Sequence, residues 1–246
     1  MKKNRLLSAF SVCKPIFGML HLKGDSAEEA VKKAFVEART MVSNGVDAVI
    51  VENYFGTLEY AEAVLRSFQQ EKVDFIYGCN ILDDDDENFR MAEQYGASFL
   101  QLDSVVGHLT PEDDIPFAAK LEACRSRYNG AVIGGVRFKY QPYLSGRSLE
   151  EDLRLGMQRC DAIAVTGEGT GKPTPVSKLV EFRAIVGEDF PLVVGAGLLP
   201  ESCEEAFRYA DAAIVGSYFK DTYHDKGDVD GEHVRALMKT VIRCRG

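Results

Sequence analysis

The chain has 246 residues and a mass of 27.2 kDa, a size that suits one barrel of parallel strands and helices better than two small domains. Its net charge of -9 and its pI near 5.1 argue against nucleic acid as the main partner, because proteins that bind a phosphate backbone usually show a basic surface. The six cysteines are scattered without a Cys-x-x-Cys pair, so we interpret them as reduced residues of a cytoplasmic protein and not as a disulfide framework or a zinc site.

The chain starts with basic residues and a short apolar stretch, MKKNRLLSAFSVCK. Ser8 and Ser11 interrupt this stretch, which is too short to span a bilayer. We therefore expect residues 1–14 to form a segment that covers one end of a single domain over residues 15–246. No later run approaches the roughly 20 apolar residues that a membrane helix needs, so no membrane span is predicted.

Short runs rich in Val and Ile alternate with longer amphipathic stretches, a pattern typical of parallel strands covered by helices. One phrase recurs as DAVIVEN, DAIAVTG and DAAIVGS, which indicates a repeated unit. Strands are predicted at 15–22, 47–52, 75–80, 98–103, 131–139, 161–166, 191–195 and 212–216. About eight parallel strands predict an α/β protein with a single (β/α)8 TIM barrel.

The stretches between the strands carry signals for helix starts. Ser26 with Glu29, and Ser148 with Glu151, have the spacing of a capping box. Further helices are predicted to begin near Leu58, Glu87, Glu112, Val176, Glu201 and Gly231. The acidic run 83–86 is expected to be the solvated start of a helix, where the helix dipole favours acids; a divalent-metal site there is the less favoured alternative.

Polar residues or glycines end nearly every predicted strand. In a TIM barrel the active site lies at these carboxyl ends, where the strand-to-helix loops meet. The residues are His21, Glu52 with Asn53, Asn80, Asp103, Arg137 with Lys139, Thr166 with Gly167, Gly195 with Gly197, and Gly216 with Ser217.

The last two strands end in VVGAGL and IVGSYFK. Loops seven and eight of such barrels commonly hold a phosphate through backbone N–H groups, so Gly195, Gly197, Gly216 and Ser217 are candidates for phosphate binding. Lys220 could add charge, although a solvated surface lysine is the more common outcome. The alternative is that these glycines serve tight turns alone.

The sixth loop is TGEGTGKPTP, from Thr166 to Pro175. Its three glycines and polar side chains, including Lys172, suit a flexible segment that closes over a ligand; the alternative is a plain loop. It is not a P-loop, because Pro173 follows the lysine and the glycine spacing is wrong, and nucleoside triphosphate hydrolysis is therefore disfavoured.

The candidate acid–base groups are Glu52, Asp103, His21 and Lys139. A carboxylate near cations could abstract a proton next to a carbonyl, and a desolvated lysine could form an imine. Glu52 and Lys139 could instead form a structural ion pair, and His21 could be a core histidine. Glu52 is favoured as the catalytic group because it ends a wholly apolar strand.

The motifs PIFGMLHLKGD, NGVDAVIVENYFG, DAIAVTGEGTGKP, PLVVGAGLLPES and DAAIVGSYFK resemble successive signatures of the BtpA/SgcQ family, from about Pro15 to the C-terminus. The resemblance implies a ribulose-phosphate-binding type of barrel with phosphate held at loops seven and eight. One branch of the family carries a label linking it to photosystem I biogenesis, and another lies among sugar-uptake genes. This chain departs from the family at strands four and five, which here are LQLDSVVGH and GGVRFKYQP, so Asp103 and Arg137 stand at positions where the family usually has other residues.

These observations favour an enzyme that isomerises, epimerises or cleaves a small phosphorylated sugar. Glu52 or Asp103 would act as base, Lys139 and Arg137 would stabilise an enediolate or carry an imine, and Asn53, Asn80 and Thr166, with Gly167 and Lys172 of the sixth loop, would bind the substrate. The rival hypothesis is a non-catalytic assembly or regulatory factor. A weaker one is a nucleotide- or nucleoside-metabolising enzyme in which Tyr54, Tyr140 or Tyr218 stacks on a base. The sequence requires no cofactor and gives no support for a metal, and a homo-oligomer is compatible with it.

Overall fold

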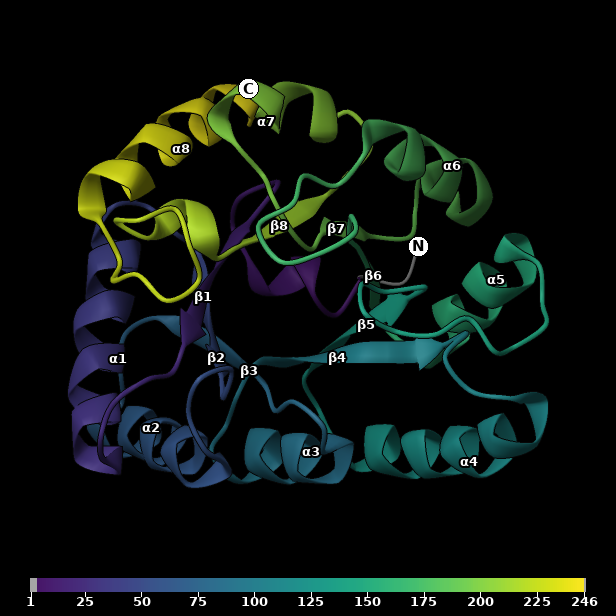
Figure 1. The fold of residues 1–246 in the computed structure, drawn as a ribbon, viewed down its shortest axis with the longest axis horizontal. Coiled ribbons are helices and arrows are strands. Elements are labelled where there is room, and N and C mark those ends of the chain that lie inside the picture. Colours follow the sequence, from purple (N-terminus) through teal and green to yellow (C-terminus); the bar gives the residue numbers. More distant parts are fainter. Residues whose placement is uncertain (1–3, 246) are drawn as a thin grey trace.

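Eight parallel strands pair in chain order and close into a barrel. The computed structural model describes residues 4–245. The strands are β1 (Ile16–His21), β2 (Ala48–Glu52), β3 (Ile76–Asn80), β4 (Phe99–Val106), β5 (Ala131–Val136), β6 (Ala162–Val165), β7 (Leu192–Val194) and β8 (Ala212–Val215). The predicted (β/α)8 TIM barrel is thereby confirmed (Figure 1).

Helices surround the barrel and follow each strand (Figure 1). They are α1 (Ala27–Ser43), α2 (Leu58–Glu71), α3 (Asp85–Gln94), α4 (Pro111–Arg127), α5 (Leu149–Arg159), α6 (Val176–Val186), α7 (Pro200–Ala206) and α8 (Gly231–Cys244), with short 3-10 turns η1 (Leu7–Ala9) and η2 (Ser217–Phe219). In residues 4–245, none of the helices combines the length and the apolar character that crossing a bilayer would require.

The alternation of side chains along each strand divides the core into two parts. One face of each strand packs outward against the helices, in a large cluster that includes Val49, Leu65 and Phe68. The other face points into the barrel, where Phe17, Ile50 and other inward residues form a second cluster. Successive side chains point to opposite faces of a strand. The residue two positions after each inner core residue therefore also points into the barrel, and it lies nearer the open end.

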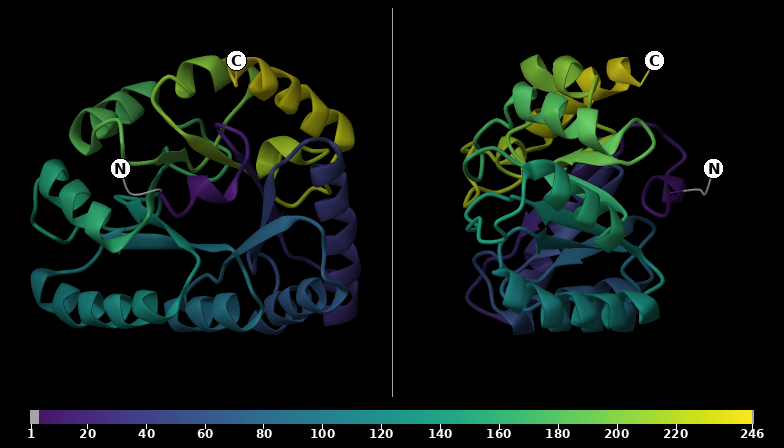
Figure 2. Two further views of the ribbon diagram at one scale, coloured as in Figure 1. Left: turned by 180° about the vertical axis from the view of Figure 1, so that it is seen from behind. Right: turned by 90° about the vertical axis from the view of Figure 1, so that its right-hand side faces the viewer.

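The N-terminal segment lies at the end of the barrel opposite the strand-to-helix loops. Leu6 is fully buried among the inner residues, next to Phe17, and Asn4 donates a hydrogen bond to the carbonyl of Asp161. Figure 2 shows η1, in purple, on the far side of the barrel from those loops. Residues 1–3 of the predicted segment, and residue 246, lie outside the described part of the chain.

The predicted helix starts are largely confirmed. Ser148 and Glu151 form a complete capping box at α5, and Asp84, in the acidic run, caps α3. At α1 the prediction was half right: Ser26 accepts a hydrogen bond from Glu29 N, but the Glu29 carboxylate bonds to the backbone of Asp25 instead of Ser26.

Strands four and five differ from their predicted bounds. β4 continues three residues beyond Asp103, and its pairing with β5 shifts register between Leu102 and Val106. β5 ends at Val136 and not at Lys139, because Arg137 adopts a left-handed backbone with φ 49° that cannot continue a strand. Both differences lie at the open end of the barrel and decide where Asp103 and Lys139 are placed.

Candidate active site

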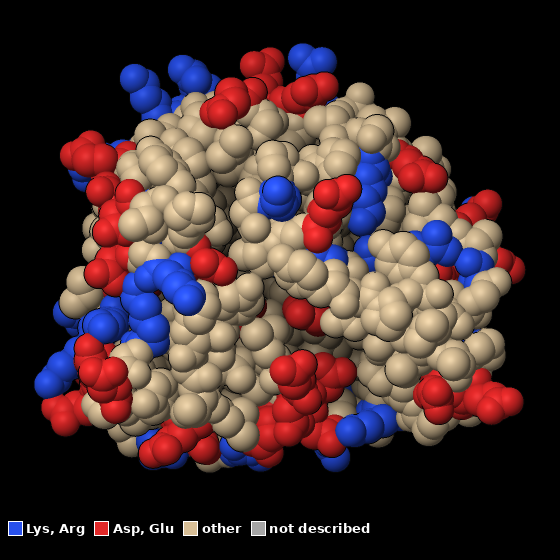
Figure 3. Space-filling model, viewed as in Figure 1, with Lys and Arg blue, Asp and Glu red and all other residues tan. Residues whose placement is uncertain are grey.

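A cavity of about 700 Å³ opens at the carboxyl ends of the strands. Figure 3 shows a hollow at the centre of this face, with an acidic group inside it and more acidic groups along its lower edge. Eight of the predicted site residues line the cavity: His21, Glu52, Asp103, Lys139, Gly195, Gly197, Gly216 and Ser217. The alternation of side chains along parallel strands explains this convergence, because their inward ends meet around one axis.

A row of polar side chains crosses β1, β2 and β3 at one height. Strand pairing places His21 beside Glu52 and Glu52 beside Asn80. His21 Nε2 lies 3.4 Å from Glu52 Oε2, and Asn80 Nδ2 donates to Glu52 Oε1 at 2.7 Å. All three side chains are buried, so their hydrogen bonds have little competition from water.

Burial sets the protonation of the first two members of this row. Desolvation, with the nearby charge of Asp103 adding to it, raises the pKa of Glu52 to about 8. Desolvation, with the positive charge of Lys220 adding to it, lowers the pKa of His21 to about 3. At neutral pH the pair therefore carries its proton on the carboxyl group and the imidazole is uncharged.

Asp103, on β4, is more exposed to solvent than Glu52. Its Oδ1 accepts hydrogen bonds from Asn80 Nδ2 at 3.3 Å and from Gln101 Nε2 at 3.1 Å. The irregular register of β4 brings the Asp103 backbone inward, and Gly135 on β5 makes room, because a Cβ at Gly135 would overlap the Asp103 carbonyl. Desolvation raises the pKa of Asp103 as well.

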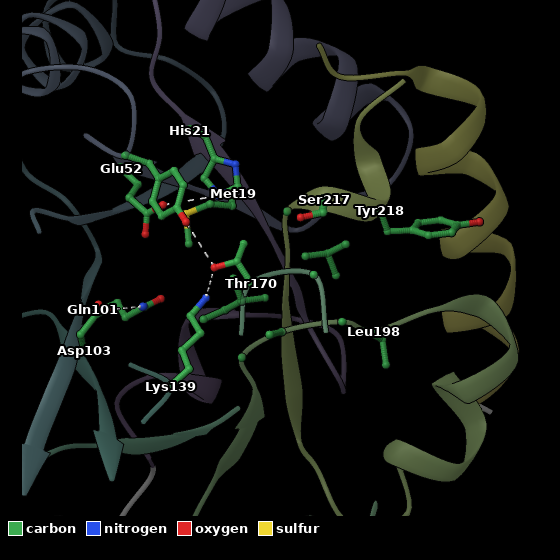
Figure 4. A pocket seen from close by; sticks show the side chains of 18 of the residues that line it. Met19, His21, Glu52, Gln101, Asp103, Lys139, Thr170, Leu198, Ser217 and Tyr218 are labelled. Atoms are coloured by element: carbon green, nitrogen blue, oxygen red, sulfur yellow. Dashed lines mark hydrogen bonds and ion pairs between the residues drawn. The ribbon is translucent and has the colours of Figure 1, made fainter. Parts of the chain in front are cut away.

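Lys139 enters the cavity from the loop after β5. Its Nζ donates to Thr170 Oγ1 at 2.9 Å, and Tyr54 Oη lies 3.4 Å from the same hydroxyl (Figure 4). The flanking Arg137 and Tyr140 both have left-handed backbones, with φ of 49° and 62°. Strained backbone of this kind persists where surrounding contacts hold it; here the Arg137 side chain bonds to Asp152, and the Tyr140 hydroxyl accepts from Thr170 N.

The opposite wall of the cavity is formed by backbone. Figure 4 shows Leu198 and Ser217 on the opposite side of the open space from Glu52, Gln101 and Asp103. The loops after β6, β7 and β8 pack on one another: a Cβ at Gly197 would overlap the Lys172 carbonyl, and one at Gly171 would contact Ser217. Within residues 4–245, the N–H groups of Gly197 and Leu198 donate no hydrogen bond, and both residues line the cavity.

Six predicted substrate-binding residues do not line the cavity. Asn80 is buried beneath it as the bridge between the two carboxyl groups. The other five act within the scaffold or lie outside: Asn53 accepts from Leu82 N, Thr166 accepts from Lys139 N, Arg137 pairs with Asp152, Gly167 packs on Pro173, and Lys172 is exposed. The side chains of Asn53, Thr166 and Arg137 are thus held by partners within the scaffold.

Lys220 differs from the expectation of a solvated lysine. Its side chain is fully buried, and Nζ bonds to Glu37 on α1 at 2.8 Å. Its carbonyl bonds to the ring of His233. It therefore anchors the start of the loop after β8 and contributes charge only at a distance, to His21.

Several cavity residues were missed in the sequence. Gln101, which holds Asp103, could have been found by counting two positions back from Asp103 on the same strand face. Tyr223 also lines the cavity, but it lies in a loop, where the sequence has no periodicity that would indicate the direction of a side chain. Within residues 4–245 no group of three or more His, Cys, Asp or Glu side chains is arranged to hold a metal ion.

The sequence profile of the BtpA family matches residues 12–243. An uncharacterized protein of Pyrococcus abyssi is 28% identical, over 95% of this chain and 98% of its own. The photosystem I biogenesis protein BtpA of Synechocystis is 22% identical, over 96% of this chain and 91% of its own. Among solved structures, thiamine phosphate pyrophosphorylase of Pyrococcus furiosus has a TM-score of 0.61 at 15% identity, covering 94% of this chain and 97% of that one, which is a similarity of fold.

Proposed function

Because the chain belongs to the BtpA family, we propose that it is an enzyme that transfers protons within a small phosphorylated sugar or a related metabolite. The reaction class is isomerisation, epimerisation or aldol-type cleavage. We also propose that it meets this metabolite in the cytoplasm, where its six free cysteines would remain reduced.

One observation carries the proposal: two buried carboxyl groups and a lysine share a cavity with glycine loops that have free N–H groups. Glu52, Asp103 and Lys139 come from three different strands or their loops. Perturbed acid–base groups that converge in a cleft are typical of catalytic sites. Such side chains can remove a proton next to a carbonyl and stabilise the charge that develops on its oxygen.

The glycine loops support a phosphate at the opposite wall. In barrels of this fold, the loops after the last two strands commonly bind phosphate through backbone N–H groups. Gly197, Leu198 and Ser217 offer such groups and a hydroxyl. A sugar spanning the cavity from Ser217 would present its carbon atoms to Asp103 and Lys139, and the Thr170 loop would cover it.

A panel of ligands tests this function by thermal unfolding. Triose, pentose and hexose phosphates are compared with the matching free sugars, nucleotides and inorganic phosphate, each with and without magnesium. A ligand at about 100 times its Kd should add roughly 2.7 kcal/mol of stability and raise the Tm by several degrees. A shift with a sugar phosphate, and none with its free sugar, supports the proposal and identifies the substrate to assay.

The tyrosines around the mouth favour a second candidate, a nucleotide-metabolising enzyme. Tyr54, Tyr140, Tyr218 and Tyr223 line the cavity, and rings of this kind can stack on a base. The same panel separates the candidates, because nucleotides alone would then raise the Tm. If no compound shifts the Tm of the folded protein, a non-catalytic assembly role becomes the leading hypothesis.

A further inference from the structure

We propose that the two carboxyl groups have opposite roles: Glu52 is the general acid, its proton held in place by His21, and Asp103 is the general base. This division rests on the proposed function and makes it more specific. Sequence alone favoured Glu52 as the base; the hydrogen bonds around His21 lead to the reverse assignment.

The carbonyl of Asp225 fixes the tautomer of His21. It lies 3.2 Å from Nδ1, and because a carbonyl oxygen can only accept, Nδ1 must carry the hydrogen. Nε2 of the neutral ring is then an acceptor, and it faces Glu52 Oε2 at 3.4 Å. A carboxylate there would meet a lone pair, whereas a protonated Glu52 can donate to it.

The loop that carries Asp225 is held over His21 by Lys23. Lys23 Nζ donates to the carbonyl of Lys226 at 2.6 Å and forms an ion pair with Asp228 at 2.7 Å. The Asp225 carbonyl is therefore a fixed part of the site, and the loop after β8 determines which nitrogen of His21 is protonated.

The hydrogen bond to the second oxygen of Glu52 is also compatible with a protonated carboxyl group. Oε1 accepts from Asn80 Nδ2, whose other contact is Asp103 Oδ1. One amide group thus joins the two carboxyl groups, and their mutual repulsion is relieved when one of them holds a proton. Asp103 is the more exposed of the two and accepts two hydrogen bonds from amides, so the proton belongs on Glu52.

Charged groups from other elements act in both directions on this pair. Asp103 and Asp225 raise the pKa of Glu52, and Lys139 lowers it, while burial has the largest effect. Lys220, Lys139 and Lys23 all oppose a positive charge on His21. Burial, with these cations adding to it, keeps the imidazole neutral, so the ring can accept a hydrogen bond from protonated Glu52 while the proton stays on Glu52.

The assignment gives a balanced proton transfer. The Asp103 carboxylate takes the proton from the carbon next to the substrate carbonyl, and the C–H electron pair forms the carbon–carbon double bond of an enediol. The carbonyl π electrons move onto oxygen, which takes the proton of Glu52. For isomerisation the reverse steps follow at the neighbouring carbon, where Asp103 returns the proton and Glu52 is protonated again by the adjacent hydroxyl group.

NMR of the full-length protein without substrate tests the proton positions. The 15N shifts of His21 should show hydrogen on Nδ1 and a bare Nε2 at neutral pH. The 13C signal of the Glu52 carboxyl group is assigned by its absence in Glu52→Gln and its persistence in Glu201→Gln. It should titrate near pH 8 in the wild type. The pH of its midpoint should be lower in Asp103→Asn. A charged imidazole, or a Glu52 already ionised at neutral pH, would overturn the assignment even if the enzyme is active.

The pH dependence of turnover tests the roles separately. With Glu52 as the acid, kcat falls as pH rises through about 8, because the proton to be donated is lost. With Glu52 as the base, kcat would rise through the same range. If no substrate is found, the proposed function fails, while the NMR result still decides where the proton lies.

Discussion

The two halves of the barrel mouth are built from different chemistry at equivalent positions. On β1 to β4 the inward positions near the opening hold His21, Glu52, Asn80 and, on β4, Gln101 and Asp103. At the inward positions that end or follow β5 to β8 stand Gly135, Thr166, Gly195 and Gly216. We refer to these as the acidic half and the glycine half.

The acidic half presents side chains to the cavity, whereas the glycine half presents mainly backbone. In the acidic half, side chains hydrogen-bond one another across neighbouring strands, and burial shifts the pKa of Glu52 and His21. In the glycine half, the absence of side chains lets the loops after β6, β7 and β8 pack together, and Gly197 and Leu198, whose N–H groups donate no hydrogen bond within residues 4–245, line the cavity. The proposed proton transfer and the proposed phosphate recognition are therefore expected to be separable by mutation.

The largest effect is expected from Asp103→Asn in the acidic half. The asparagine oxygen can still accept from Asn80 and Gln101, but it cannot take a proton from carbon. General base catalysis typically contributes about 100- to 10,000-fold, so kcat should fall by that factor while the Kd for the substrate, measured by thermal shift, changes little. Asp83→Asn removes the same charge from the cavity lining and should retain activity. A mutant of Asp103 that loses ligand binding as well would contradict the division.

A second prediction concerns stability in the acidic half. The pKa of Glu52 is raised from 4.5 to about 8 on folding, so its contribution to stability is full at low pH and is lost as pH rises toward 8. His21 acts in the opposite sense, since its lowered pKa costs stability as pH falls from 6.5 toward 3. The free energy of unfolding should therefore decrease most clearly between about pH 6.5 and 8, by about 1.4 kcal/mol per pH unit, because in that range only Glu52, of the two groups, contributes to the slope.

Glu52→Gln should abolish this loss. The glutamine resembles the protonated glutamic acid, because its oxygen can accept from Asn80 and its NH2 group can donate to His21. The mutant should equal the wild type in stability below about pH 4.5 and become a few kcal/mol more stable as pH rises to about 8, as measured by urea unfolding across pH. Parallel curves for the two proteins would mean that Glu52 is already ionised in the folded state.

The sequence was sufficient to predict the fold, because eight apolar runs alternate with amphipathic stretches. His21, Glu52 and Gly195 were found because they lie at the ends of predicted strands, where the strand-to-helix loops of such a barrel meet. Local backbone could not be predicted: Arg137 leaves the strand with a left-handed turn that directs its side chain to Asp152, and the irregular register of β4 shifts Asp103. These features depend on contacts with other strands and helices. Lys220 was misjudged for the same reason, since its partner Glu37 is 183 residues away in the chain.

The third prediction disturbs the glycine half through Gly197→Ala. Gly197 has φ 65°, and a Cβ there would overlap the Lys172 carbonyl. Gly187 at the end of α6 has φ 77° with nothing near its Cβ position, so Gly187→Ala is a matched control that carries only the backbone strain. We expect Gly197→Ala to cost about 1–3 kcal/mol more than the control, by urea unfolding, and to weaken phosphate binding. An equal loss of unfolding free energy in the two mutants would show that the loops after β6 and β7 can move apart without an energetic cost.

The smallest effect is expected from Ser217→Ala. Ser217 lines the cavity opposite the carboxyl groups (Figure 4), and its hydroxyl would be one of several donors to a phosphate. A single hydrogen bond contributes about 1 kcal/mol, which corresponds to roughly a fivefold weaker Kd. The Kd for the sugar phosphate should rise by that factor, the Kd for the free sugar should stay constant, and kcat at saturation should not change. A loss of kcat with an unchanged Kd would place Ser217 with the proton-transfer groups and remove the distinction between the two halves.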